Sequence, residues 1–485
     1  QKIVVSHNQN STKPIVSVIL ADGTKYSVKV KTIDENTVEL RAKDSIHARV
    51  VVKPQPADQK GDKLNENTRM LLMGTARMLM MIRRVNITYK GNYSTSLPGF
   101  APNIGAAFGQ NNASGLAPGL AFAFGATGQE FIDKAYDNGW LVRDRSLSYT
   151  TNYNRSHNVN VQVNLEPFNN FRIDVNSSWN RSYSTTTQIA FDARTNTYSG
   201  SMSMTTISLG SCFEGHSAKR GYASKTFDRF VKNLDVIQAR VQAQYAGAVY
   251  PESMTGEPGK KFNPEVYGGV DKYSADVMIP AFLAAYTGGK ASSRPLGVFP
   301  KMFAMLPNWT LSYGGLSKLA AFQKVFKSFN INHSYKSQFS MGQYSTYASF
   351  HEYMDGLGFI SNVQTGNPIP SSMYNINTVS INESFVPLIG ISCTMNNNLS
   401  ARLEYRKTRV LNLSMSAQQI METTSDDIVV GAGYKVVGLK LFGAKPGTGR
   451  NKVSNDLDIN LDFSLRNQSA LNRNIAKQYT QATDL

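Results

Sequence analysis

Cysteine is almost absent from this sequence: Cys212 and Cys393 are the only two in 485 residues. Two thiols so far apart in the chain supply neither a disulfide framework nor a cysteine metal cluster. We expect both to be unpaired packing residues, and the sequence leaves open a single bridge between them. The chain is therefore no small scaffold held together by disulfides.

Long apolar runs are also missing. The longest, MLLMGTARMLMMI at 70–82, contains Arg77 and falls short of the ~20 residues that a helix needs to cross a bilayer. No transmembrane helix is expected. A membrane-spanning β-strand needs only ~9 to 11 alternating residues, so a membrane β-protein stays open.

Motifs for catalysis are missing too. HEYMD at 351–355 begins like a zinc-protease helix, but Asp355 stands where the second histidine is required. GAKPGTGRNK at 443–452 lacks the glycine spacing of a phosphate-binding loop, and we interpret it as a turn. The six histidines are scattered, and no G-x-S-x-G elbow occurs. We expect no enzymatic activity, no catalytic residue, no metal site and no cofactor.

Charge is unbalanced but dispersed. The chain carries 51 Lys and Arg against 34 Asp and Glu, which gives a formal net charge of +17. Nucleic-acid-binding modules concentrate basic residues on a helix or interleave them with aromatic platforms, and neither pattern occurs. We expect no nucleic-acid partner. The simplest interpretation of the positive charge is a basic surface without a specific partner. The second interpretation is attraction to anionic lipid head groups.

What the sequence does contain is alternation of polar and apolar side chains. NVNVQVNL at 158–165 and FRIDVNSSWN at 171–180 flank a turn over 166–170, which predicts an antiparallel hairpin. Similar runs occur at 85–95, 308–313, 329–339, 389–415 and 456–466. Because side chains of a strand point to opposite faces with period two, each run predicts one polar and one apolar face.

Alternation also fits a soluble β-sandwich, but two features favour a membrane barrel. The runs often exceed the usual strand of roughly five to six residues. Short turns alternate with long connections, which we place at 186–198 and 211–305, and this asymmetry is typical of outer-membrane barrels. The predicted fold is all-β: a transmembrane antiparallel β-barrel, formed only in part by this chain, with long loop insertions and a few short helices.

The barrel hypothesis assigns the two faces to two solvents. The polar residues are expected to face a water-filled lumen: Asn158, Asn160, Gln162, Asn164, Arg172, Asp174, Asn176, Asp456, Asp458, Asn460 and Asp462. The apolar residues are expected to face lipid: Val159, Val161, Val163, Leu165, Ile173, Val175, Trp309, Leu311, Tyr313, Leu457, Ile459, Leu461 and Phe463.

The predicted organisation follows the chain. It comprises a small β unit at 1–60, a short helix at 61–84, barrel strands at 85–210 with a glycine-rich loop insertion at 96–130, a long insertion at 211–304 with an amphipathic helix at 225–245, and C-terminal strands at 305–485. Long ordered loops usually carry function, so the two insertions are expected to form a cap, gate or partner surface. Because the chain begins at Gln1 and ends in polar QYTQATDL, we interpret it as a mature piece or fragment that lacks at least one later strand.

Several stretches resemble one known family. They are LPGFAPNIGAAFG, FIDKAYDNGW, VNLEPFNNFRIDV, SMTTISLGS, VMIPAFLAAYTGG, LPNWTLSYGGLSKL and SFVPLIGISCTMNNNLSARLEYRKTRVLNLSM, in order from about residue 85 to 485. They are similar to the SprA/Sov family, the outer-membrane translocons of the type IX secretion system of Bacteroidota.

The resemblance implies a very wide barrel in the outer membrane of a Gram-negative bacterium, which exports folded cargo proteins from the periplasm to the cell surface. It implies a lateral opening, a PorV-type partner β-barrel, a periplasmic plug protein, and contact with outer-membrane lipid and lipopolysaccharide. The N-terminal β unit is expected in the periplasm or the lumen. A soluble or surface-anchored β-rich adhesin and a passive porin or nutrient transporter remain the alternatives.

Overall fold

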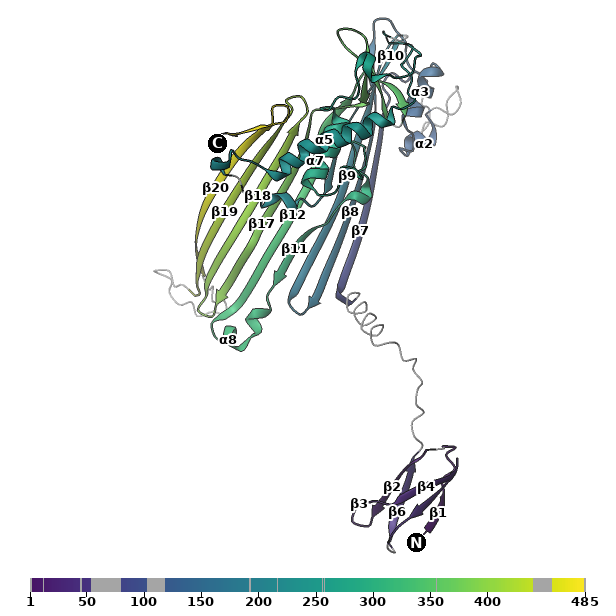
Figure 1. The fold of residues 1–485 in the computed structure, drawn as a ribbon, viewed down its shortest axis with the longest axis vertical. Coiled ribbons are helices and arrows are strands. Elements are labelled where there is room, and N and C mark those ends of the chain that lie inside the picture. Colours follow the sequence, from purple (N-terminus) through teal and green to yellow (C-terminus); the bar gives the residue numbers. More distant parts are fainter. Residues whose placement is uncertain are drawn as a thin grey trace, which may run out of the picture. The chain divides into compact units, whose positions relative to one another are not determined.

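The chain folds as two compact units, Gln1–Leu79 and Met80–Leu485 (Figure 1). The computed structural model describes residues 2–11, 13–43, 46–53, 80–102, 118–191, 193–215, 217–254, 256, 258–354, 356–438 and 456–483.

The N-terminal unit consists of two three-stranded antiparallel sheets. Their orders are β1–β5–β4 (Lys2–Ser6, Thr37–Arg41, Lys29–Asp34) and β3–β2–β6 (Lys25–Tyr26, Ile15–Leu20, Ala48–Lys53). Val18, Val38 and Leu40 form the buried centre, and Tyr26 and Val28 pack against it. Tyr26, Val28 and Val30 alternate with polar residues in the sequence, but Val30 is exposed.

The larger unit is built on one twelve-stranded antiparallel sheet. Its main path is β21–β20–β19–β18–β17–β12–β10–β9–β8–β7, and β11 and β16 pair with strands of this path. The strands are β7 (Ile82–Ser96), β8 (Ser148–Phe168), β9 (Phe171–Ala190), β10 (Ala193–Thr205), β11 (Asn308–Tyr313), β12 (Phe326–Thr346), β16 (Tyr374–Ile376), β17 (Thr378–Met395), β18 (Leu399–Ser414), β19 (Gln419–Val436), β20 (Leu457–Asn474) and β21 (Tyr479–Thr483). β8 and β12 each contain 21 residues, several times the usual strand length.

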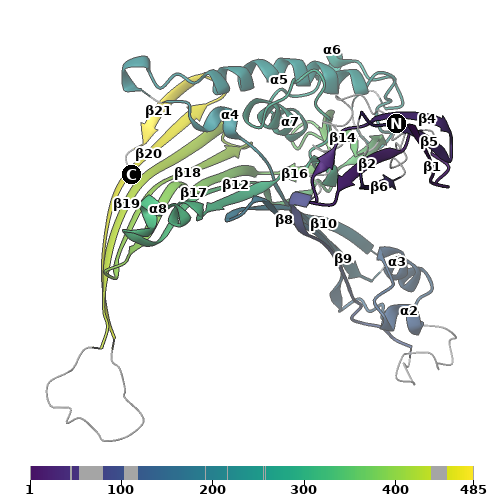
Figure 2. The ribbon, with the colours of Figure 1, turned by 90° about the horizontal axis from the view of Figure 1, so that it is seen from below.

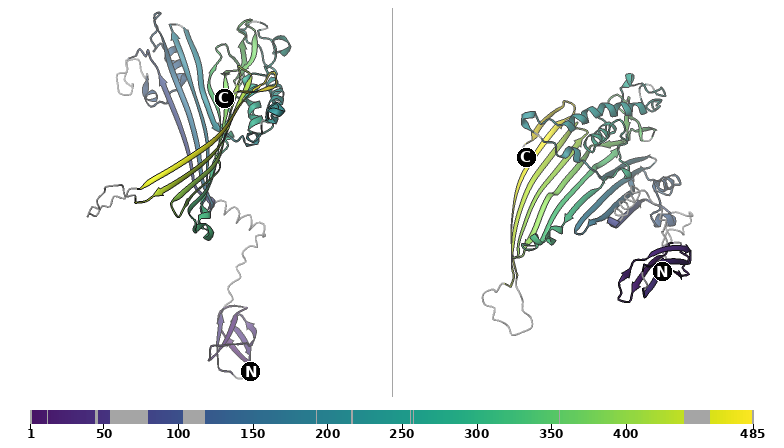
Figure 3. Two further views of the ribbon diagram at one scale, coloured as in Figure 1. Left: turned by 90° about the vertical axis from the view of Figure 1, so that its left-hand side faces the viewer. Right: turned by 60° about the horizontal axis from the view of Figure 1, so that its bottom comes forward.

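The sheet of the larger unit is twisted and arched. Figure 2 shows the helices α5 (Lys225–Gln244) and α7 (Ala275–Tyr286) together on one side of this sheet. The strands at the two ends cross at a large angle when the sheet is viewed edge-on (Figure 3), as the right-handed twist of strands requires.

One position in this sheet is shared by two strands. β10 pairs with β9 and β12 along its length and ends at Thr205. β11 then occupies the next stretch of the same position, pairing Trp309 with Val175 of β9 and with Tyr335 of β12. The peptide N–H of Leu306 donates to the carbonyl of Thr205 at 3.0 Å, so residues 206–307 leave and rejoin the sheet at one point.

Residues 206–307 form a helical insertion. Besides α5 and α7, its elements are α4 (Leu209–Cys212), η1 (Ala218–Arg220), α6 (Pro264–Tyr267) and η2 (Met302–Ala304). The hydroxyl of Ser224 accepts from the peptide N–H of Phe227 and thereby caps α5. α5 confirms the helix predicted at 225–245, and its buried face carries Phe230, Leu234 and Ile237.

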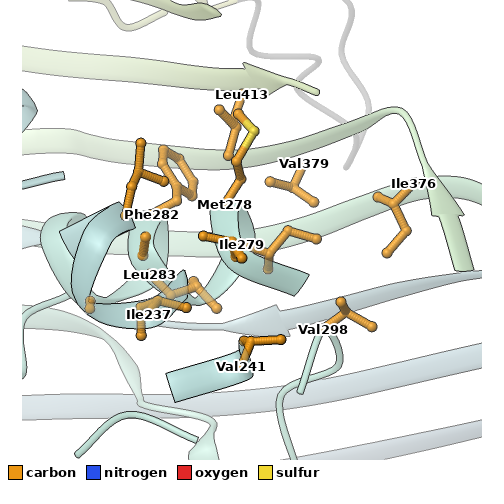
Figure 4. Close-up of a cluster of buried hydrophobic side chains, with 14 of the residues drawn as sticks. Ile237, Val241, Met278, Ile279, Phe282, Leu283, Val298, Ile376, Val379 and Leu413 are labelled. Atoms are coloured by element: carbon orange, nitrogen blue, oxygen red, sulfur yellow. The ribbon is translucent and has the colours of Figure 1, made fainter. Parts of the chain in front are cut away.

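The hydrophobic core of the larger unit lies between this insertion and one face of the sheet. α7 is buried on nearly every side, with α5 against it and the strands beneath. Figure 4 shows Ile237 and Val241 of α5, Phe282 and Leu283 of α7, and Leu413 of β18 within this cluster.

The remaining connections carry short elements. These are α2 (Gly119–Ala123) and α3 (Gln129–Asp137) between β7 and β8, η3 (Gly315–Lys318) and α8 (Ala320–Gln323) between β11 and β12, and the small sheet β13 (His351–Met354), β14 (Leu357–Ser361) and β15 (Pro368–Ser372) between β12 and β16. Ala135 of α3 packs with Ile189 of β9, so α3 covers the end of β8 and β9 that lies away from their connecting turn.

Several sequence predictions need correction. The hairpin of 158–180 is confirmed, but its turn is confined to Asn169 and Asn170, and Asn170 adopts a positive φ of 66° that favours asparagine. The long connection predicted at 186–198 is wrong, because β9 continues to Ala190 and β10 begins at Ala193. The polar tail contributes β21, which was not expected to be a strand.

Other predictions fall at the borders of the described residues. The helix predicted at 61–84 lies mostly outside them; Met80 and Met81 are helical, and β7 begins at Ile82, so the predicted end at 84 is wrong. Part of the glycine-rich segment, 103–117, and the turn predicted at 443–452 also lie outside the described residues.

The packing of α5 predicts a sharp difference between two of its residues. Leu234→Ala removes a fully buried side chain and should destabilise the insertion by about 2 to 5 kcal/mol, through lost burial and the remaining cavity. Val236→Ala, on the exposed side of the same helix, should change the stability by less than about 0.5 kcal/mol. Amide hydrogen exchange of α5 and α7 measures both, and equal effects of the two variants would contradict this core.

Candidate functional site

The register of the sheet decides which side chains share a face, because directly paired residues of antiparallel strands point to the same side. One continuous row links seven strands: Phe463, Val430, Leu403, Ile391, Ile331, Tyr313 and Phe171. All residues that the sequence assigned to lipid lie on this apolar face. The residues assigned to the lumen lie on the opposite, polar face, except Asp456, which precedes β20.

Part of the apolar face is exposed. Its exposed large side chains, which we call the apolar belt, extend from β7 to β20: Val85, Ile87, Tyr89, Ile389, Leu403, Tyr405, Ile428, Val430, Tyr434, Leu457, Ile459, Leu461, Phe463 and Leu465. Leu461, for example, is 73% exposed. A contiguous apolar surface of this extent is rare on a soluble monomer and indicates an interaction surface.

The predicted lipid-facing residues of β8, β9 and β11 continue the belt, but with less exposure. Val161, Val163, Leu165, Ile173, Val175, Leu311 and Tyr313 are at least partly buried. Val159 is only 7% exposed. The ring of Trp309 lies 4.6 Å from the ring of Tyr335 and packs against the cluster of Cys212 and Phe385. Val159 and Trp309 are thus covered by other parts of the protein, unlike the exposed residues of the belt.

The apolar belt ends at a polar boundary on neighbouring strands. Beyond Tyr405 and Ile428 on the same face come Lys407 and Asp426, which form an ion pair of 2.9 Å. The Tyr405 hydroxyl donates to the Asp426 carboxylate at 2.8 Å, so its ring lies in the belt and its polar end outside it. On β20 the apolar run stops at Leu465, two residues before Asn467 on this face.

A buried charge ladder follows beyond this boundary. It consists of Glu383, Arg409, Glu422 and Arg473, which come from β17, β18, β19 and β20 and are at most 3% exposed. Arg409 donates to Glu383 at 2.7 Å and lies 3.7 Å from Glu422, which accepts from Arg473 at 3.1 Å. Each charge therefore has an opposite partner, as burial in a protein requires.

The charge ladder also holds the insertion. The Ser208 hydroxyl donates to Glu383 at 2.8 Å, and Arg409 donates to the hydroxyl of Ser211 at 2.9 Å. Arg473 donates to the carbonyl of Tyr222 at 2.8 Å. Sequence reasoning missed this network, because its four charges come together only after the strands are aligned.

The polar face carries small and charged side chains. A hollow of about 310 Å³ lies over Gly431 and Gly433, between Asn460, Asp462 and Arg402. A Cβ added at either glycine would approach the side chains of Asp462 or Asn460 too closely, so glycine keeps room for them. Arg402 and Asp462 form an exposed ion pair of 3.2 Å.

Aromatic side chains gather where the strands turn beyond the belt. Phe168 and Phe171 stack at 4.9 Å in the β8–β9 turn, with Tyr313 of β11 against both. Around α8, a second cluster has ring centroids 5.3 to 5.8 Å apart and consists of Phe322, Phe326 and Phe329. The clusters could have been found from the sequence, because each combines a turn with closely spaced aromatic residues.

Both ends of the sheet have unpaired edges within the described part of the chain. β7 pairs only with β8 there, and β20 pairs with β21 only over Ala470–Asn474. The outer edge of β20 from Leu457 to Ser469 is thus unpaired among the described residues, and it lies beside the apolar belt.

The histidine of the HEYMD motif lies in a strand rather than in a helix. His351 belongs to β13 and contacts the hydroxyl of Ser253 at 2.9 Å, and position 355 lies outside the described residues. Within the ranges that the structure describes, no three His, Cys, Asp or Glu side chains are grouped to hold a metal ion. No helix of those ranges is long and apolar enough to span a membrane.

Cys212 and Cys393 are both unbonded, which confirms the expectation of unpaired thiols. Cys212 is buried in α4, and burial raises the pKa of its thiol to about 12. No protein-family model matches this sequence, and no curated protein matches it significantly.

The charge ladder predicts that removal of a single buried charge strongly weakens the attachment of the insertion to the sheet. Glu383→Gln keeps the size of the side chain but leaves Arg409 short of its nearest charge, which should destabilise docking of the insertion by about 3 to 5 kcal/mol. Asp235→Asn, in the exposed pair with Lys272, should cost less than about 1 kcal/mol. Urea unfolding combined with proteolysis at 206–307 measures both; a Glu383→Gln variant as stable as Asp235→Asn would refute this role.

Proposed function

We propose that this chain forms part of the wall of an outer-membrane β-barrel that conducts folded proteins. The observation that carries this proposal is the apolar belt: one face of a continuous sheet is apolar and exposed over many strands, and the other is polar along the same strands. In the proposed arrangement the belt contacts lipid, and the polar face, including Asn158, Asn160, Asp458 and Asn460, lines a hydrated lumen.

The height of the belt supports this arrangement. On β20 it runs from Leu457 to Leu465. At a rise of ~3.3 Å per residue and a tilt of about 40°, such a stretch spans roughly 20 to 25 Å, close to the apolar band of membrane barrels. The flanking aromatic residues and the Lys407–Asp426 pair fit the interfacial regions that border such a band.

A soluble β-sandwich accounts for the same alternation less well. In a sandwich the apolar face of each sheet is buried against a second sheet. Here the insertion covers the charge ladder, the neighbouring Tyr335 and Phe385, and the part of the apolar face beyond the ladder, whereas the belt residues are exposed. In an adhesin this surface would be exposed to water, and each large apolar side chain would lack the roughly 1.5 to 3 kcal/mol of favourable free energy that its burial provides.

Among the described residues, the outer edges of β7 and of most of β20 are unpaired, which supports a sheet that forms only part of a barrel. Unpaired peptide groups in hydrocarbon are costly, so a membrane-embedded sheet must close. We infer that further strands pair with these edges and complete a ring much wider than the described strands alone. A wide ring favours passage of folded proteins over a passive porin, and it agrees with the resemblance to the SprA/Sov translocons.

The proposed partners follow from this function and from the same resemblance. They are secreted cargo proteins, a PorV-type partner β-barrel, a periplasmic plug protein, and lipid with lipopolysaccharide. Small polar side chains on the lumenal face, such as Ser400 and Asn460, would let cargo pass without binding tightly. The chain itself is proposed to supply a conduit, with no enzymatic step.

Two adjacent residues of β20 test the membrane assignment. Phe463→Arg places a charge in the apolar belt and should impair membrane assembly, with a cost of about 2 to 4 kcal/mol. Ser464→Arg, exposed on the polar face, should assemble as the parent protein does. The measurement is the fraction of protein in the heat-modifiable, protease-resistant form in outer membranes.

Cysteine labelling separates lipid from a protein core at the same positions. In a Cys212→Ser, Cys393→Ser background, a fluorophore on a cysteine introduced at 463 should be quenched by nitroxide lipids, and one at 464 by a water-soluble quencher. If position 463 were shielded from nitroxide lipids and the protein dissolved without detergent, the barrel proposal would be abandoned.

The width of the proposed pore leads to a prediction about its partners. A pore that admits folded proteins would leak unless it is closed when idle. We therefore expect the protein extracted from its native membrane to copurify with at least one plug or partner barrel, as judged by mass spectrometry of the intact complex. Repeated isolation without a partner, from cells that still exclude vancomycin, would contradict a wide open conduit.

A further inference from the structure

The helical insertion borders a cavity that the barrel wall does not require. It has a volume of about 610 Å³ and lies between α5, α7, the loop 295–301 and the small sheet β13–β14–β15. Most of its lining residues are apolar, with contributions from Val241, Leu296, Val298, Leu357 and Met373. The cavity is thus large enough for one long side chain and its neighbouring backbone.

One buried charged group lines this cavity. Asp276 lies in the first turn of α7 and is 4% exposed. Neither oxygen of its carboxylate accepts a hydrogen bond from any residue that the structure describes. Unpartnered buried carboxylates are rare, because loss of hydration is normally offset by hydrogen bonds or by an opposite charge.

The surroundings of Asp276 do not supply the missing partner. The hydroxyl of Ser274 is close enough to favour the charged carboxylate, but it donates to the carbonyl of Asp271 at 2.7 Å instead. Burial is the larger influence and raises the pKa of Asp276. Lys301 also lines the cavity, but it is exposed and pairs with no carboxylate of the described residues.

A second carboxylate lies at the exposed side of the cavity. Glu352 of β13 lines it and accepts from the peptide N–H of Gly356 at 2.8 Å. Together with Asp276 it gives the cavity two carboxylates, against one lysine in Lys301. The cavity therefore favours a cation over an anion.

The chemistry of the cavity selects its occupant. Arginine and lysine have aliphatic stems that pack on apolar walls and cationic ends that seek a carboxylate. A divalent metal ion is a poor alternative, because it needs several oxygen ligands, and within the described ranges no metal-binding group of acidic side chains gathers around Asp276. Phe303, 90% exposed beside the adjoining hollow, offers further apolar contact to an incoming segment.

We propose that this cavity binds an arginine or lysine side chain presented by a polypeptide partner, with Asp276 as its counter-ion. The insertion is then a docking module for a protein segment that carries an exposed basic residue. This inference rests on the insertion, the small sheet and the adjoining Met373 and Tyr374, and it holds whether or not the large sheet belongs to a protein-conducting barrel.

A matched pair of peptides tests the proposal on the whole detergent-solubilised chain. The probes are fluorescein-labelled Ala-Gly-Arg-Gly-Ala and the same peptide with citrulline, which has the shape of arginine without its charge. Fluorescence polarisation should show saturable binding of the arginine peptide, and affinity for the citrulline peptide about tenfold or more weaker. Equal binding of the two peptides, or no saturable binding, would overturn the proposal.

Variants assign any binding to this cavity. Asp276→Asn should abolish the preference for arginine, whereas Asp271→Asn, which alters an exposed carboxylate five residues earlier, should preserve it. Leu296→Trp should fill the cavity and block the arginine peptide while Asp276 stays intact, which guards against misfolding of the first variant. An arginine preference that survives both Asp276→Asn and Leu296→Trp refutes the site. Competition by calcium chloride, but not by sodium chloride of equal ionic strength, would assign the cavity to a metal ion instead.

Discussion

The structure of the larger unit depends on an unbroken antiparallel register. Side chains alternate between the two faces of the sheet, and directly paired residues lie on the same face. The residues paired with an apolar side chain therefore meet the same environment, whether solvent or protein core. A slip of one residue in β18 would bring Arg402 and Glu404 onto the apolar face and Leu403 onto the polar one. The belt, the charge ladder and the core beneath the insertion are therefore three zones of one aligned surface.

These zones meet different surroundings along the same strands. β18 passes from the exposed Leu403, through Arg409 in the charge ladder, to Leu411 beneath the helices. An isolated strand offers no reason to separate Leu403 from Leu411, since both are leucines on the same face. The covering insertion makes the difference, and it comes from a part of the chain some two hundred residues earlier.

This separation explains what the sequence could and could not predict. Alternation predicted the hairpin of 158–180 and the face of β20, and helical spacing of apolar residues predicted the amphipathic helix α5, because each depends on local periodicity. It missed α7, which is buried on nearly every side and contains Pro280, and it missed β19, where Glu422 and Thr424 interrupt the apolar pattern. It also missed Asp276, whose importance comes from the cavity that distant segments build around it.

The strand position shared by β10 and β11 couples the insertion to the continuity of the sheet. β11 has only six residues, and it reaches its place between β9 and β12 only when residues 206–307 fold back to the point where they left. If the insertion were to unfold, the loop joining the two strands would gain entropy, and β11 would lose the anchoring of its N-terminal end. β9 and β12 would then lose their common neighbour beside Val175 and Tyr335, so the continuity of the sheet at that height depends on the folded insertion.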